Sequence, residues 1–154
     1  MKRRFNITGS CNLQRHYMVK LDSRLKQIKE NYVDYGSYFV INRGRQYGKT
    51  TTIRALEEYL KDDYIVLSLD FQELGTEEFA DEPTFVRSFT EVLIRAFQMN
   101  KLSGSEGLLK ALNEFIKKGD NGLKNLFVQL SALCENSPRP IVLMIDEVDS
   151  ASNN

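Results

Sequence analysis

Three short apolar runs, separated by longer amphipathic stretches, constrain the fold of this 154-residue chain more than any other feature. The runs are Tyr38–Ile41, Tyr64–Phe71 and Ile141–Ile145, and each is rich in the β-branched and aromatic side chains that strands favour. The first two enclose a helical stretch, and a strand, a helix and a second strand within about thirty residues form a βαβ unit. The pattern therefore predicts an α/β fold whose strands lie parallel in one sheet.

Five further stretches predict helices, because apolar side chains recur in them at steps of three and four. They cover residues 21–35, 53–60, 85–96, 108–116 and 123–134. We expect residues 1–36 to form an N-terminal extension with one helix. We expect residues 37–154 to form the core domain.

Charge and composition exclude several classes of function. Lys and Arg together number 21, as do Asp and Glu, so the formal net charge is zero. This balance argues against a gross attraction to nucleic acid or to an anionic membrane. No apolar run approaches the ~20 residues that span a bilayer. Cys11 and Cys134 lack a partner motif, which fits a reducing cytoplasm, and His16 alone cannot build a zinc site.

A Gly-Lys-Thr motif follows the first predicted strand and opens the next predicted helix. A helix N-terminus presents unpaired N–H groups and the positive end of its dipole, and glycine lets the backbone wrap around phosphate oxygens. Lys49 would reach the β- and γ-phosphates, and the Thr50 hydroxyl would bind Mg²⁺. The expected phosphate-binding residues are Gly44, Arg45, Gln46, Tyr47, Gly48, Lys49, Thr50 and Thr51.

This motif departs from the usual G-x-x-x-x-G-K-[ST] pattern, because Arg43 stands where the first glycine belongs and Gly44 follows it. A plain turn ahead of a helix therefore stays an alternative for this motif taken alone.

Two adjacent carboxylates follow the third apolar run. Such charges at the end of a buried strand are costly unless they have partners or a function. Asp146 would hold the Mg²⁺ shell, and Glu147 would orient or deprotonate a water for attack on the γ-phosphate. A solvated transition from strand to loop is the alternative. Both motifs follow predicted strands, at the edge where open α/β sheets bind ligands, so we expect them to serve one site.

These residues resemble the P-loop NTPases of the AAA-like group, with Walker A at residues 44–50 and Walker B at residues 141–147. The adjacent carboxylates are similar to the additional-strand, catalytic-glutamate division. The run Ile41–Thr52 also resembles bacterial predicted AAA-like ATPases of unassigned process. In those proteins, a Phe-Asn-x-Thr-Gly opening and a His-Tyr-Met-Val stretch precede the loop, as residues 5–9 and 16–19 do here.

The resemblance implies a three-layer P-loop NTPase fold with a mostly parallel sheet, truncated after the Walker B strand. It implies ATP and Mg²⁺ as cofactors, Lys49 and Glu147 as catalytic residues, and Thr50 and Asp146 as metal ligands. By the same analogy Tyr17 and Met18 are candidates for the base pocket, with closure of the core edge as the alternative. A sensor strand and an arginine finger would lie downstream, in the C-terminal remainder of a longer protein.

The function expected from this resemblance is an ATPase coupled to an unidentified process, with the fragment itself binding ATP and turning over slowly or not at all. A nucleotide-dependent switch or scaffold with little hydrolysis is the first alternative. A P-loop kinase acting on a small molecule is the second, although no acceptor pocket is evident. The expected partners are the nucleotide and the remainder of the protein, and the oligomeric state stays open.

Overall fold

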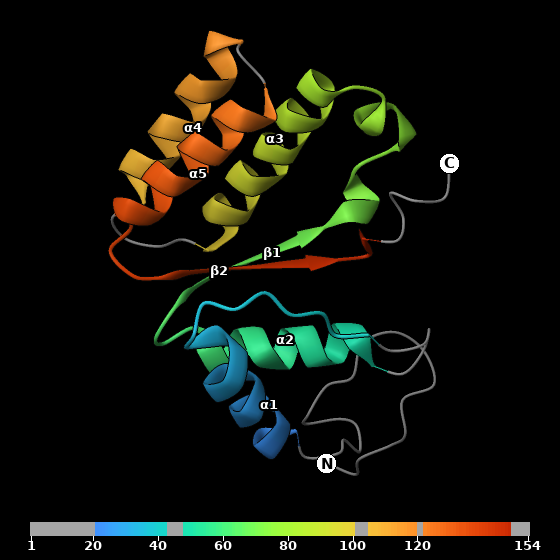
Figure 1. Ribbon diagram of the computed structural model, residues 1–154, viewed down its shortest axis with the longest axis vertical. Helices are drawn as coiled ribbons and strands as arrows, with labels where there is room; N and C mark the ends of the chain where they lie inside the picture. Colours follow the sequence, from blue (N-terminus) through green and yellow to red (C-terminus); the bar gives the residue numbers. More distant parts are fainter. Residues whose placement is uncertain (1–20, 43–47, 101–104, 120–121, 149–154) are drawn as a thin grey trace. The chain divides into compact units, whose positions relative to one another are not determined.

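The computed structural model describes residues 21–42, 48–100, 105–119 and 122–148. Contacts between residues divide the chain into a first unit, residues 1–62, and a second unit, residues 63–154 (Figure 1). The domain boundary predicted between residues 36 and 37 is a different division of the chain and stays a prediction.

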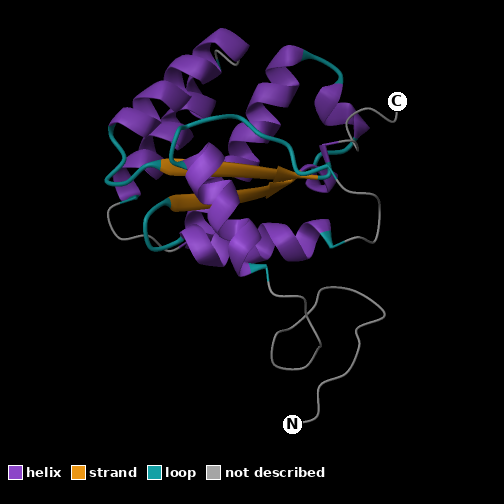
Figure 2. Cartoon of the chain, turned by 60° about the horizontal axis from the view of Figure 1, so that its bottom comes forward, coloured by secondary structure: helices purple, strands orange, loops and turns teal. Residues whose placement is uncertain are grey.

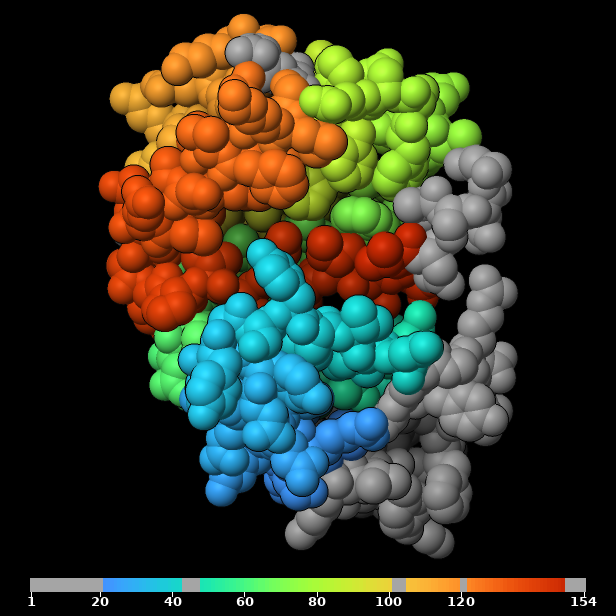
Figure 3. Space-filling view, viewed as in Figure 1, coloured from blue at the N-terminus to red at the C-terminus, as the bar shows by residue number. Residues whose placement is uncertain are grey.

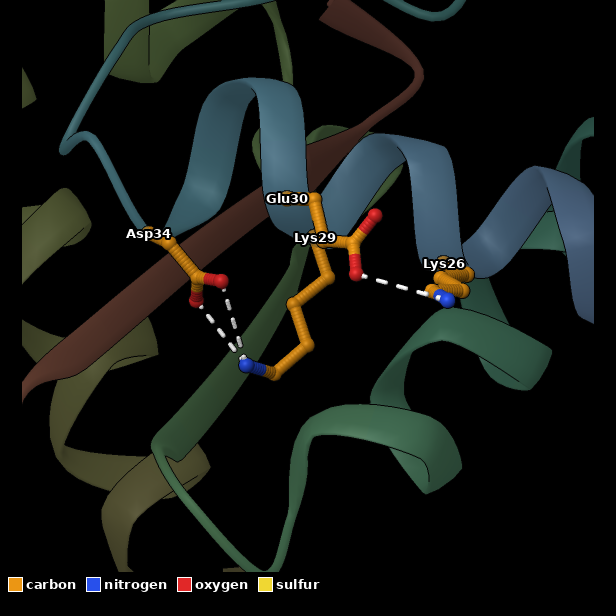
Figure 4. Close-up of polar contacts among 4 residues, drawn as sticks. All are labelled: Lys26, Lys29, Glu30 and Asp34. Carbon is orange, nitrogen blue, oxygen red and sulfur yellow. Dashed lines mark hydrogen bonds and ion pairs between the residues drawn. The ribbon is translucent and has the colours of Figure 1, made fainter.

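The first unit begins with a helix that widens before it ends. Helix α1, Asp22–Ile28, continues as the π-helix η1, Lys29–Val33, and the amide of Asp34 donates to the carbonyl of Lys29 at 2.9 Å. This five-residue step places the two side chains together, and Lys29 Nζ lies 3.0 and 3.3 Å from the carboxylate oxygens of Asp34 (Figure 4). The predicted helix over residues 21–35 is thus largely confirmed, with a π-turn that propensity does not reveal.

Helix α2, Lys49–Leu60, is the second helix of this unit, and it contacts α1. Its buried side chains are Thr52, Leu56 and Leu60, which recur every four residues and therefore lie on one face. The predicted apolar face was Ile53, Leu56 and Leu60; Leu56 and Leu60 are buried, and Ile53 is half-buried.

The second unit joins a small sheet to a group of three long helices. Its elements are β1 (Ile65–Asp70), η2 (Phe71–Glu73), η3 (Thr76–Phe79), α3 (Glu82–Asn100), α4 (Glu106–Lys118), α5 (Leu123–Glu135) and β2 (Ile141–Asp146). Helix α3 packs on β1, and α3, α4 and α5 contact one another. Figure 1 shows these helices on one side of the two strands.

The two strands are parallel neighbours, in a register that pairs Ile65 with Ile141 and Asp70 with Asp146 (Figure 2). Alternate residues of β1 enter the core beneath the helices, as period-two alternation requires. The buried apolar side chains of this core are Ile65, Leu67, Leu69, Phe71, Leu74, Val86, Phe89, Val92, Leu93, Ile94, Phe97, Leu108, Leu112, Phe115, Leu126 and Leu133. The predictions of strands at residues 64–71 and 141–145 are confirmed to within one residue at either end.

The expected three-layer P-loop fold with a mostly parallel sheet is wrong. The described part of the chain is mostly helical, and its sheet has two strands. Residues 38–41, the expected first strand, have no regular secondary structure, and the side chains of Tyr38 and Val40 are 104% and 88% exposed. Strand propensity becomes a strand only where a neighbouring strand supplies hydrogen bonds, and no described strand pairs with this segment.

Candidate functional site

The start of helix α2 holds the described part of the predicted phosphate-binding segment. Gly48 is the N-cap residue, with φ 77° and ψ 31° in the left-handed region, where a glycine meets no Cβ penalty. Lys49, Thr50 and Thr51 then form the first turn of the helix. The left-handed residue turns the chain sharply into the helix, as the predicted phosphate loop requires. The other predicted residues, Gly44, Arg45, Gln46 and Tyr47, lie outside the described residues.

Thr52 stabilises this turn by hydrogen bonds, and it was not among the site residues predicted from the sequence. Its backbone amide and its Oγ1 each donate to the carbonyl of Gly48, both at 2.9 Å, and its side chain is 1% exposed. Two donors on one carbonyl fix the orientation of the peptide that enters the helix. A threonine four residues after the glycine was the available signal, because a hydroxyl at that spacing reaches the carbonyl one turn back.

The N-terminus of α2 differs from that of α3. Before α3, Asp81 accepts a hydrogen bond from the amide of Thr84 at 2.8 Å, and this amide lowers the pKa of the Asp81 carboxyl. The N-cap of α2 provides no side-chain hydrogen bond, and its first turn contains no acidic residue. An uncapped first turn presents backbone N–H groups and a positive dipole end, which suit an anion.

The carboxyl end of β2 carries the two predicted acidic residues. Asp146 is the last residue of the strand, and its Oδ1 accepts a hydrogen bond from the amide of Glu147 at 2.9 Å. Glu147 has φ 55°, the only positive φ among the described residues other than glycine. The strand therefore ends in a sharp turn that Asp146 stabilises, and both carboxylates are half-buried.

Asp70 ends the neighbouring strand and was also missed in the sequence analysis. It stands in register with Asp146, and paired residues of parallel strands point to the same face of the sheet. Its Oδ1 accepts from the amide of Gln72 at 2.9 Å, which begins η2. The rule that parallel strands bring their carboxyl ends to one edge was the signal that could have found it.

The two groups of predicted residues fall in different units. Gly48–Thr51 belong to the first unit, and Asp146 and Glu147 belong to the second. Each group of residues is a candidate site because of its own local geometry. That the two groups together form one site stays a prediction. The donor chemistry fits Mg²⁺, since the Thr50 hydroxyl and the Asp146 carboxylate are oxygen ligands. Across residues 21–42, 48–100, 105–119 and 122–148, no three His, Cys, Asp or Glu side chains gather as a metal cage.

The remaining predictions concern residues near the ends of the chain. Cys11, His16, Tyr17 and Met18 lie outside the described residues. The helix predicted at residues 123–134 is confirmed, but the expectation that Cys134 belongs to its apolar face is wrong, because Cys134 is exposed. Among the helices of the described segments, none combines the length and the apolar character needed to cross a membrane.

No protein-family model, no curated protein and no solved structure matches the chain.

Proposed function

We propose that the chain binds ATP with Mg²⁺ and that the full-length protein hydrolyses it, as the AAA-like group that it resembles does. One observation carries this proposal: α2 begins at Lys49, directly after a left-handed glycine, without a side-chain cap. Lys49 forms no ion pair with any described residue. A basic side chain beside uncapped amides is a combination that attracts phosphate.

The residues have separate roles in this proposal. Lys49 and the backbone of the phosphate-binding segment, residues 44–51, bind the phosphates. Thr50 and Asp146 hold Mg²⁺, and Glu147 orients or deprotonates the attacking water. The metal, when bound, neutralises the charge that develops on the phosphate oxygens. Asp146 has a second task in this scheme, because its Oδ1 holds the backbone of Glu147 in place.

Calorimetric titration of the full chain with ATP and Mg²⁺ tests the proposal. We expect saturable binding by the parent protein and at least about a hundredfold weaker binding by Lys49→Ala, because the loss removes a charge-assisted contact to phosphate. Lys61→Ala is the matched control, since Lys61 lies just beyond the other end of α2, exposed and paired with Glu58. Equal ATP affinity in the parent and in Lys49→Ala would refute the assignment.

Binding without turnover would instead support a nucleotide-dependent switch or scaffold. Steady-state phosphate release by the full-length protein separates the two functions. The process that the nucleotide drives would then be sought through the remainder of the protein. A cytoplasmic location stays a prediction from the use of cysteine.

A further inference from the structure

Thr52 and Thr90 make the same local hydrogen bond in two different settings. Each hydroxyl donates to the carbonyl four residues back: Thr52 Oγ1 lies 2.9 Å from the oxygen of Gly48, and Thr90 Oγ1 lies 2.7 Å from the oxygen of Val86. Both side chains are buried, at 1% and 0% exposed. The bond of Thr90 lies within α3, whereas the bond of Thr52 ends on the N-cap residue of α2. Every buried hydroxyl needs an acceptor, so the position of the acceptor is what distinguishes Thr52.

Gly48 does not fix its own conformation. Glycine has no Cβ, so it adopts left-handed and right-handed backbone about equally well, and it loses more conformational freedom on folding than any other residue. The N-cap provides no side-chain hydrogen bond. The carbonyl of Gly48 is instead held by two donors of Thr52, its amide and its hydroxyl, both at 2.9 Å. Because the Thr52 side chain is buried, the lost hydroxyl would leave no room for water to take its place as a donor.

The orientation of this carbonyl determines the orientation of the next amide. In a planar trans peptide the C=O and N–H groups point in opposite directions. The carbonyl of Gly48 points along α2 toward Thr52, so the N–H of Lys49 points out of the helix N-terminus, where the proposed phosphates would bind. The start of the helix reaches the surface, since Thr50 is exposed and Lys49 is half-buried (turquoise in Figure 3).

We propose that Thr52 is a positioning residue for the phosphate chain of the nucleotide. Its hydroxyl holds the peptide between Gly48 and Lys49 in the orientation that donates to phosphate. Because the hydroxyl is buried and donates to a carbonyl, it acts through the backbone and does not touch the ligand. The apparent affinity of a site falls with the fraction of molecules in the binding-competent form, which is the quantity that this hydrogen bond raises. The inference rests on the proposed binding of ATP.

Substitutions that remove different parts of the Thr52 side chain test this role by calorimetric titration of the full chain with ATP and Mg²⁺. Thr52→Val keeps the branched shape and loses the hydroxyl, so we expect binding about three- to tenfold weaker, the usual contribution of one hydrogen bond. Thr52→Ser keeps the hydroxyl and loses a buried methyl, so it should lower stability and retain the parental affinity. Thr52→Ala differs from Thr52→Ser in the hydroxyl alone, and it should bind as weakly as Thr52→Val.

Inorganic tripolyphosphate isolates the contribution of the phosphates, because it carries the phosphate chain without a base or a sugar. Thr52→Val should weaken the binding of tripolyphosphate and of ATP by the same factor. Thr90→Val is the matched control, since it removes the same bond from an equally buried threonine in α3. It should lower stability by a similar amount in urea denaturation and leave both affinities unchanged.

The failure of this inference can be distinguished from the failure of the proposed function. If the parent protein binds neither ATP nor tripolyphosphate, the proposed function is wrong and the inference is wrong with it. If the parent binds and the variants without the hydroxyl bind equally well, the site stands and Thr52 has no positioning role. Equal weakening by Thr52→Ser and Thr52→Ala, or by Thr90→Val, would mean that binding follows overall stability. A loss confined to ATP would place the effect on the base or the sugar, and these results would also overturn the proposal.

Discussion

Gly48 and Glu147 have the same unusual backbone conformation but differ in what that conformation costs. Gly48 has φ 77° at the start of α2, and Glu147 has φ 55° after β2. A left-handed backbone is free for glycine and costs a residue with a Cβ roughly 1–2 kcal/mol. Glutamate therefore stands where glycine would be more stable. Thr52 fixes the first turn from within its own helix, and Asp146 fixes the second from the residue before it.

The difference shows which of the two turns carries backbone strain. Gly48 adopts its conformation without strain, so at this turn the phosphate-binding proposal depends on Lys49 and the uncapped amides rather than on a backbone penalty. Glu147 is strained, and strained residues concentrate at functional sites, where the rest of the structure stabilises them. This contrast favours a role for the Glu147 side chain, and substitutions at Glu147, Gly48 and Asp146 test it.

The largest effect should come from removing the carboxylate of Glu147. In Glu147→Gln of the full-length protein we expect unchanged ATP affinity and a fall in turnover of about 10²–10⁴, the usual contribution of a general base. Phosphate release and calorimetric titration measure the two quantities. Glu135→Gln, which neutralises an exposed glutamate at the end of α5, should leave both unchanged. Turnover at the parental rate in Glu147→Gln would remove the catalytic role.

The next effect concerns the glycine. Gly48→Ala places a Cβ on a left-handed residue and should destabilise the start of α2 by roughly 1–2 kcal/mol. The cost is conformational, since the nearest atom to that Cβ, Thr51 Cβ, lies at an ordinary 4.0 Å. Hydrogen exchange of the α2 amides measures it. Gly107→Ala, in α4 with open space around it, should instead be neutral or stabilising. Equal behaviour of the two variants would contradict the contrast.

Removing the support of the second turn should have a somewhat smaller effect. Asp146→Ala deletes the acceptor for the amide of Glu147 and should cost about 1 kcal/mol. Asp146→Asn keeps an acceptor oxygen and should cost less. Urea denaturation of both variants measures the difference. If alanine and asparagine are equally tolerated, the hydrogen bond does not hold the turn.

The smallest effect should come from relieving the strain. Glu147→Gly removes the Cβ penalty but gains chain entropy in the unfolded state, so we expect a net change of at most about 1 kcal/mol, toward greater stability. Glu114→Gly, in the exposed interior of α4, should lose roughly 1 kcal/mol and provides the reference in the same assay. A loss at Glu147 as large as the loss at Glu114 would show that the glutamate is not strained.

Local features of the sequence predicted more than its long-range features did. The helix start at Lys49 depends on a glycine and on residues within one turn, and the strand at Ile141 depends on a continuous apolar run. Tyr38–Ile41 has similar composition but lacks a strand partner, and partner choice depends on residues far along the chain. The predicted sheet was wrong for this reason.

The candidate site shows the same limit. Residue type and spacing predicted Gly48, Lys49 and Asp146, whereas Asp70 depends on the register of two strands that are separated by three long helices. The π-turn at Lys29–Val33 likewise has no single-residue signature. The sequence therefore predicted the functional residues within each segment, but it did not predict residues such as Asp70 that folding places beside them.

Amide chemical shifts of the isotopically labelled full chain, titrated with ATP and Mg²⁺, test the central claim most directly. If the first turn of α2 binds phosphate, the amides of Gly48, Lys49, Thr50 and Thr51 should shift most and should saturate together. In Lys49→Ala the same shifts should need at least about a hundredfold more ATP to saturate. Saturation by ATP with these four amides unmoved would contradict the account.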